Sequence, residues 1–200
     1  MADGRATGTL VLVGVLGGGS WTAFQRSDES RLATNPLDRW SRRVIGALAT
    51  ELEAEALYPF GGPPFLPFLR WAQRAEPVYP SPIGPLIHPD YGLWHAYRGA
   101  LAFARRIELP PPDTRPRPCD ACPDKPCLTS CPVGAFSHAG YDVPACIGHV
   151  SSDTGQECLE GGCLARRACP VGARHRYAPA QMRFHMHAFV EANRSRTRQK

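Results

Sequence analysis

Residues 119–135 read CDACPDKPCLTSCPVGA, and residues 169–173 repeat the pentapeptide CPVGA. Each copy begins with a cysteine, and an exact internal repeat headed by a potential metal ligand predicts two similar sites. All eight cysteines of the 200-residue chain lie between these limits, so they divide into two sets of four with none left over. They are Cys119, Cys122, Cys127, Cys131, Cys146, Cys158, Cys163 and Cys169.

The spacing of these cysteines indicates iron–sulfur chemistry. Bacterial ferredoxins with two cubane clusters use Cys-x2-Cys-x2-Cys-x3-Cys-Pro, whose fourth cysteine ligates the other cluster. The first run here is Cys-x2-Cys-x4-Cys-x3-Cys-Pro, and the second, Cys-x4-Cys-x5-Cys-Pro, is looser. Loops rich in proline and glycine set turns without a ladder of backbone hydrogen bonds, so they can wrap the chain around a cube. The pattern predicts two 4Fe-4S clusters.

Zinc and disulfides are alternatives for the same cysteines. Zn²⁺ accepts four cysteines, commonly in Cys-x2–4-Cys pairs, and Cys119 with Cys122 would suit it. The Cys-Pro that closes each half does not favour zinc. A disulfide framework requires an oxidising compartment. The apolar run from Leu10 to Leu16 is short and lacks a basic lead or an A-x-A site, which argues against export.

Length and composition are those of a globular protein with one ordinary domain and a small one. Apolar residues make up 43% of the chain, charged residues 20%, and no run reaches the length of a membrane span. We therefore expect a cytoplasmic protein without a membrane partner. The formal net charge of +5 counts every cysteine as neutral. Eight thiolates with two oxidised clusters would bring it to about +1, so the basic balance does not predict nucleic-acid binding.

The region before the cysteines predicts an α+β domain. Residues 9–16 form a β-branched apolar run typical of a buried strand, and residues 98–107 alternate as a second strand does. Asn35 and Pro36 predict the start of a helix, as its N-cap and first turn. A shorter helix is expected over about 65–75. The apolar stripe predicted to face the core is Leu37, Trp40, Val44, Leu48 and Leu52.

Residues 77–97 carry five prolines and predict a loop without regular structure. It holds His88, Tyr91 and Trp94, and long ordered loops usually have a function. The alternative is an extended connector whose aromatic side chains simply pack. The prolines between 110 and 118 predict a stiff link into the cysteine region. A helix is expected from Pro179, followed by a basic tail.

The cysteine region resembles the ferredoxin module of epoxyqueuosine reductases, and reductive dehalogenases carry a related module. The resemblance rests on CPVGAF at 131–136, on YDVPACI at 141–147 and on the three late cysteines. It implies one cluster on Cys119, Cys122, Cys127 and Cys169, and the other on Cys131, Cys146, Cys158 and Cys163. In this crossed ligation, Cys131 and Cys169 each close the cube built mainly by the other half.

A second resemblance covers about residues 34–112. NPLD at 35–38, YPF at 58–60 and especially IHPDYGLWHAYRG at 87–99 are similar to the cobalamin-processing (decyanating) protein family. The resemblance implies a truncated nitroreductase-like fold. It also implies a corrinoid site, with cobalamin or a docking partner contacted by His88, Tyr91, Trp94 and Arg98. No motif assigns a catalytic residue.

The sequence thus predicts an α+β domain over 1–110, a loop-rich dicluster ferredoxin-like module over 113–178, and a C-terminal helix with its tail over 179–200. The predicted function is single-electron transfer through two 4Fe-4S clusters with a redox partner protein. One alternative is a corrinoid-dependent reductase or cobalamin-processing protein, for which tRNA would enter as a partner in the epoxyqueuosine case. The other is a zinc-binding interaction module.

Overall fold

The computed structural model describes residues 4–137 and 140–197, and the fold is α+β with small antiparallel sheets. The chain divides into two compact units. The first comprises Met1–Pro77 and His95–Thr114, and the second comprises Val78–Trp94 and Arg115–Lys200. The proline-rich residues 78–94 therefore belong with the cysteine region, whereas the sequence-based boundary at 110 groups them with the N-terminal domain.

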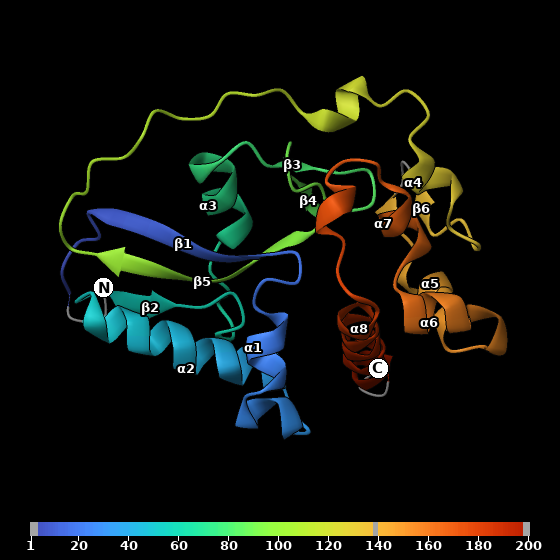
Figure 1. The fold of residues 1–200 in the computed structure, drawn as a ribbon, viewed down its shortest axis with the longest axis horizontal. Helices are drawn as coiled ribbons and strands as arrows, with labels where there is room; N and C mark the ends of the chain where they lie inside the picture. Colours follow the sequence, from blue (N-terminus) through green and yellow to red (C-terminus); the bar gives the residue numbers. More distant parts are fainter. Residues whose placement is uncertain (1–3, 138–139, 198–200) are drawn as a thin grey trace. The chain divides into compact units, whose positions relative to one another are not determined.

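The first unit is built on a three-stranded antiparallel sheet in the order β1-β5-β2 (Figure 1). Its strands are β1 (Thr9–Leu16), β2 (Glu55–Leu57) and the central β5 (His95–Phe103). The strand predicted at 9–16 is confirmed, but it is an edge strand rather than a buried one, and Val11 is 38% exposed. The strand predicted at 98–107 begins three residues earlier and ends at Phe103, because its pairing with β1 runs from Leu16–His95 to Thr9–Phe103.

Helix α2 (Pro36–Glu51) packs against the sheet and begins where the sequence predicts. Its buried face is Ser41, Ile45 and Ala49. The predicted stripe is wrong in part, since Val44 and Leu52 are each 39% exposed. The reason lies in β5, where a Cβ added to Gly99 would lie 2.8 Å from Ile45 Cδ1, so the glycine admits Ile45. The shorter helices of this unit are α1 (Trp21–Gln25) and α3 (Phe68–Ala75), with a 3-10 turn at Asp28–Arg31.

The second unit begins with a small hairpin, β3 (Tyr79–Pro80) and β4 (Leu86–Ile87). The prediction that residues 77–97 lack regular structure is therefore wrong, because the five prolines lie where they do not break this short ladder and the start of β5. The rest of the described unit consists of short helices, one pair of two-residue strands and the long helix α8. In order they are α4 (Pro126–Thr129), β6 (Phe136–Ser137), β7 (Gly140–Tyr141), α5 (Val143–Val150), α6 (Gln156–Gly161), α7 (Leu164–Ala168) and α8 (Pro179–Thr197), with 3-10 turns at Pro118–Ala121, Asp153–Gly155 and Ala173–His175.

The cysteines take part in both hydrophobic cores of the second unit. One core combines Cys119, Cys127 and Cys169 with apolar side chains of residues 79–93, which we call the hairpin region. The other combines Cys158 with Val150 of α5 and Val190 of α8. The helix predicted from Pro179 is confirmed as α8, and its Met186, Phe189 and Val190 pack in this core.

In the described part of the chain, none of the helices combines the length and apolar character needed to cross a membrane.

Candidate metal centres

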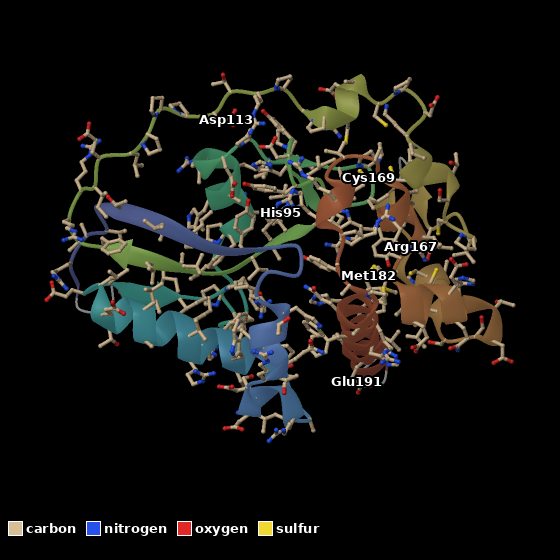
Figure 2. All side chains as sticks on the ribbon, in the orientation of Figure 1. His95, Asp113, Arg167, Cys169, Met182 and Glu191 are labelled. Atoms are coloured by element: carbon tan, nitrogen blue, oxygen red, sulfur yellow. The ribbon has the colours of Figure 1, made fainter. Side chains whose placement is uncertain are left out.

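Three thiols lie in the first core of the second unit, and a fourth, Cys122, lies nearby. Cys119, Cys127 and Cys169 are buried there, and Cys169 is labelled in Figure 2. Burial raises the pKa of the Cys169 thiol, and the neighbouring Cys127, Cys119 and Cys122 raise it further. Cys122 is only partly buried. The fold thus brings Cys169, from the end of the cysteine region, beside three cysteines from its beginning.

The other four thiols, Cys131, Cys146, Cys158 and Cys163, line a common cavity. Burial raises the pKa of the Cys146 thiol, a hydrogen bond from Tyr141 lowers it, and the nearby Cys131 and Cys158 raise it again. The two sets are neighbours, since Cys131 and Cys163 also pack against the core that contains the first set.

All eight cysteines are free thiols in the structure. Among residues 4–137 and 140–197, no three or more His, Cys, Asp or Glu side chains are grouped so as to hold a metal ion as they stand. The thiols are gathered in two sets, and neither set is closed around a single ion.

The repeated pentapeptide forms similar turns with different surroundings. Gly134 and Gly172 both adopt the left-handed region, with φ of 57° and 66°, which glycine enters at little cost. A Cβ at Gly134 would meet nothing within 4 Å, whereas one at Gly172 would lie 2.3 Å from the carbonyl carbon of Tyr91. The second copy therefore needs glycine for close packing as well as for its φ.

Helix caps and glycine turns determine the positions of Cys146, Cys158 and Cys163. The Asp142 carboxylate accepts a hydrogen bond from the amide of Ala145 at 2.9 Å, which caps α5 and places Cys146 in its first turn. At Gly155 an added Cβ would lie 1.9 Å from the carbonyl oxygen of His149, so only glycine allows the turn that leads into α6 and Cys158. Gly162, with φ of 84°, then ends α6 immediately before Cys163.

Each set has a polar side chain beside one of its sulfurs. The Arg117 guanidinium lies next to Cys119 and lowers the pKa of that thiol, which burial raises. The Tyr141 hydroxyl forms a hydrogen bond with Cys146, and burial together with this bond raises the pKa of Tyr141. The amide of Ala135 also donates to Cys131 Sγ at 3.3 Å. Our sequence reasoning missed Arg117 and Tyr141, whose only signal is their position shortly before Cys119 and Cys146.

Residues 88–94 pack on the turn that follows Cys169. Gly92 has φ of 57°, and a Cβ there would lie 1.9 Å from the carbonyl oxygen of Val171. The buried His88 ring stacks on Tyr91 with centroids 4.2 Å apart, and its Nδ1 accepts from the amide of Asp90 at 3.0 Å. Gly92 therefore allows this segment to pack closely against Val171, and the stacking of His88 on Tyr91 makes the segment an ordered one.

Trp94 is 1% exposed and lies in an aromatic and cationic cluster that the sequence did not predict. The Arg166 guanidinium carbon lies 4.6 Å from the Trp94 ring centroid and 4.7 Å from that of Tyr177. Arg166 Nε also donates to the carbonyl oxygen of Leu93 at 3.1 Å. This cluster joins the hairpin region to α7.

The four residues expected to contact a cofactor or partner do not all form one group. His88, Tyr91 and Trp94 belong to the second unit. Arg98 belongs to the first, where it pairs with Asp38 and its Nε donates to Ser41 Oγ at 3.1 Å. His88 and Trp94 are both buried within the second unit.

No protein family, curated protein or solved structure matches this chain.

Proposed function

We propose that this chain is an iron–sulfur electron-transfer protein that carries two 4Fe-4S clusters. The observation that supports the proposal is that Cys169 lies near Cys119, Cys122 and Cys127, while the other four cysteines line one cavity. Eight thiols in two such sets match the ligand number of two cubanes.

The residues around the thiols fit this use. Thiolates are the ligands that iron–sulfur clusters take, and clusters of this kind supply single-electron transfer when bound. Burial of Cys119, Cys127 and Cys169 limits the access of water to three of the four thiols of the first set. Arg117 and Tyr141 place positive charge or a hydroxyl donor beside sulfur, which is where negative charge increases on reduction. In each set, a neighbouring side chain would thus stabilise negative charge on sulfur.

At the level of the fold, we propose a loop-rich ferredoxin-like module in the second unit and a truncated nitroreductase-like domain in the first. Support comes from the short helices and turns around the cysteines, and from the antiparallel β1-β5-β2 sheet packed on α2. We further propose a cytoplasmic location, where thiols stay reduced, and a redox protein as partner.

An electron carrier is favoured over a corrinoid-dependent reductase. The reductase would need His88 and Trp94 to face a ligand, but both side chains are buried against their own unit. The His88 ring stacks on Tyr91, and the Trp94 ring lies against the Arg166 guanidinium.

The test is anaerobic purification and reconstitution, followed by analysis of iron, acid-labile sulfide, zinc and cobalt. Two clusters predict about eight irons and eight sulfides per chain. Zinc without labile sulfide would show that the sets form zinc sites instead. Stoichiometric cobalt in the purified protein would instead support the corrinoid alternative.

A further inference from the structure

We propose that the segment around the start of α3 (Figure 1) docks on the surface of an anionic lipid membrane. Five exposed residues make up this surface, which we call the α3 patch: Phe65, Leu66, Leu69, Arg70 and Arg74. The sequence-based expectation of no membrane partner rests on the lack of a spanning run, which a surface contact does not need. The inference is independent of the proposed metal centres, because the α3 patch belongs to the first unit and the cysteines to the second.

The apolar part of the α3 patch consists of three large side chains within five positions of the chain. Phe65 is 67% exposed, Leu69 is 63% exposed and Leu66 is 38% exposed. Single exposed apolar residues are normal, but several together mark a surface that binds something else. Pro64 and Pro67 flank the first two, so the backbone that presents them is fixed and their ordering costs little on binding.

The exposed side chains cannot turn into the core, because other residues of α3 already fill it. The sequence carries Phe-Leu twice, at 65–66 and at 68–69. Phe68 is 5% exposed and Ala72, one turn later, is fully buried. The Phe68 ring also packs on Trp71, with the two centroids 5.0 Å apart. The core therefore takes one of the two Phe-Leu pairs by its phenylalanine and leaves Leu69 outside.

Two cations lie beside these apolar side chains. Arg70 and Arg74 are four residues apart in α3, so they lie on the same face of the helix. Both are exposed, and among the residues that the structure describes neither forms an ion pair. Their charge is therefore available to an anionic partner.

The segment that carries the α3 patch contains no acid. Residues 56–75 include neither Asp nor Glu. The acids that border this range in sequence are Glu55, in β2, and Glu76, whose carboxylate accepts a hydrogen bond from the Tyr97 hydroxyl at 2.7 Å. The partner that complements this segment is thus negatively charged and apolar at the same place.

A membrane with anionic lipids has both properties at one surface. Its headgroups offer phosphate oxygens, which guanidinium groups bind in a bidentate manner, and the acyl boundary directly below accepts apolar side chains. A bilayer also takes protruding side chains without a groove of matching shape, and the side chains of the α3 patch protrude. Reversible membrane binding commonly combines apolar insertion with basic residues, and the α3 patch supplies both.

The test measures how much of the full chain sediments with sucrose-loaded vesicles. One set of vesicles is phosphatidylcholine alone, and the other includes about 30% phosphatidylglycerol, an anionic lipid. Leu69→Ala removes an apolar side chain of the α3 patch. Its matched control is Leu109→Ala, because Leu109 is 64% exposed in the same unit and lies outside the patch.

A second pair of variants tests the charges. Arg70→Gln with Arg74→Gln removes both cations of the α3 patch. Arg105→Gln with Arg106→Gln is the matched control, since it removes the same charge from two other exposed arginines of the first unit. Circular dichroism verifies that each variant is folded.

We expect the wild type to bind the anionic vesicles at least about tenfold more strongly than the neutral ones. Leu69→Ala should weaken this binding about fivefold, because it removes apolar area that enters the bilayer. The loss of Arg70 and Arg74 should weaken it about tenfold or more. Both controls should stay within about twofold of the wild type, as surface substitutions away from the contact do.

Three outcomes would overturn the proposal. One is a wild type that binds neither kind of vesicle or both equally, which would leave the α3 patch to an acidic protein. Another is wild-type binding by Leu69→Ala, which would place the contact elsewhere, as on the basic C-terminal tail. The third is an equal loss in each variant and its control, which would indicate unspecific adsorption. The iron and sulfide content of the protein decides the proposed function separately from all three.

Discussion

At the scale of single residues, the two sets of thiols differ in the group beside the sulfur. The Tyr141 hydroxyl lies beside the Cys146 sulfur. The ring of Tyr141 stacks on that of Phe136, with the two centroids 4.7 Å apart. Removing a donor to sulfur destabilises the reduced, more negative state. We expect Tyr141→Phe to lower the midpoint potential of one centre by about 40 mV, the equivalent of about 1 kcal/mol for one electron.

A redox titration followed by electron paramagnetic resonance checks this prediction. The matched control is Tyr58→Phe, since the Tyr58 hydroxyl donates to the carbonyl oxygen of Arg42 in the first unit and touches no cysteine. A shift of both centres, or of neither, would show that the Tyr141 hydroxyl does not act on one sulfur.

The grouping of the thiols can be tested by pairs of serine substitutions. Cys119→Ser with Cys169→Ser removes two ligands of the same proposed cluster, so about four irons should remain. Cys158→Ser with Cys169→Ser removes one ligand from each cluster, and iron should fall close to zero. The reverse order of the two iron contents would contradict crossed ligation.

At the scale of elements, the contact between residues 91–92 and 171–172 holds the hairpin region on the second pentapeptide. Gly92→Ala requires a left-handed alanine and places Cβ 1.9 Å from the carbonyl oxygen of Val171. Gly134→Ala is the matched control, because it has the same φ of 57° and nothing within 4 Å.

We expect Gly134→Ala to cost about 1–2 kcal/mol of stability for its φ alone. Gly92→Ala should cost about 1–3 kcal/mol more for the steric overlap. Thermal unfolding midpoints of the loaded variants compare the two. Equal unfolding midpoints for the two variants would mean that the contact between Gly92 and Val171 can relax without a loss of stability.

At the scale of the whole molecule, all eight cysteines belong to the second unit. A ligand that binds only the folded state stabilises what it binds, so metal loading should protect this unit selectively. Hydrogen exchange should slow across residues 119–169 on reconstitution and remain unchanged in β1 and β5.

The hairpin β3–β4 decides between the two placements of residues 78–94. Slower exchange there on metal loading is expected if they belong with the cysteines, as their packing indicates. If hydrogen exchange in residues 78–94 is unchanged by metal loading, as expected for β1 and β5, these residues belong with the N-terminal unit instead.

Several features could be predicted from the sequence because they depend on neighbouring residues. Asn35 and Pro36 mark the start of α2, the run at 9–16 forms β1, and α8 follows Pro179. In each case, local propensity and side-chain periodicity act over a few positions. The buried stripe of α2 was displaced, because Gly99 in β5 determines which helical face fits.

By itself, the sequence determined the number of thiols, the two similar turns that carry Cys131 and Cys169, and the positions of the long helices. These properties are local in the chain. Only the tertiary structure decided that residues 78–94 pack on the Cys169 turn, that Trp94 lies against Arg166 and Tyr177, and that Cys122 borders a cavity. Such contacts join residues far apart in sequence, and their stability depends on close packing, which no local pattern encodes.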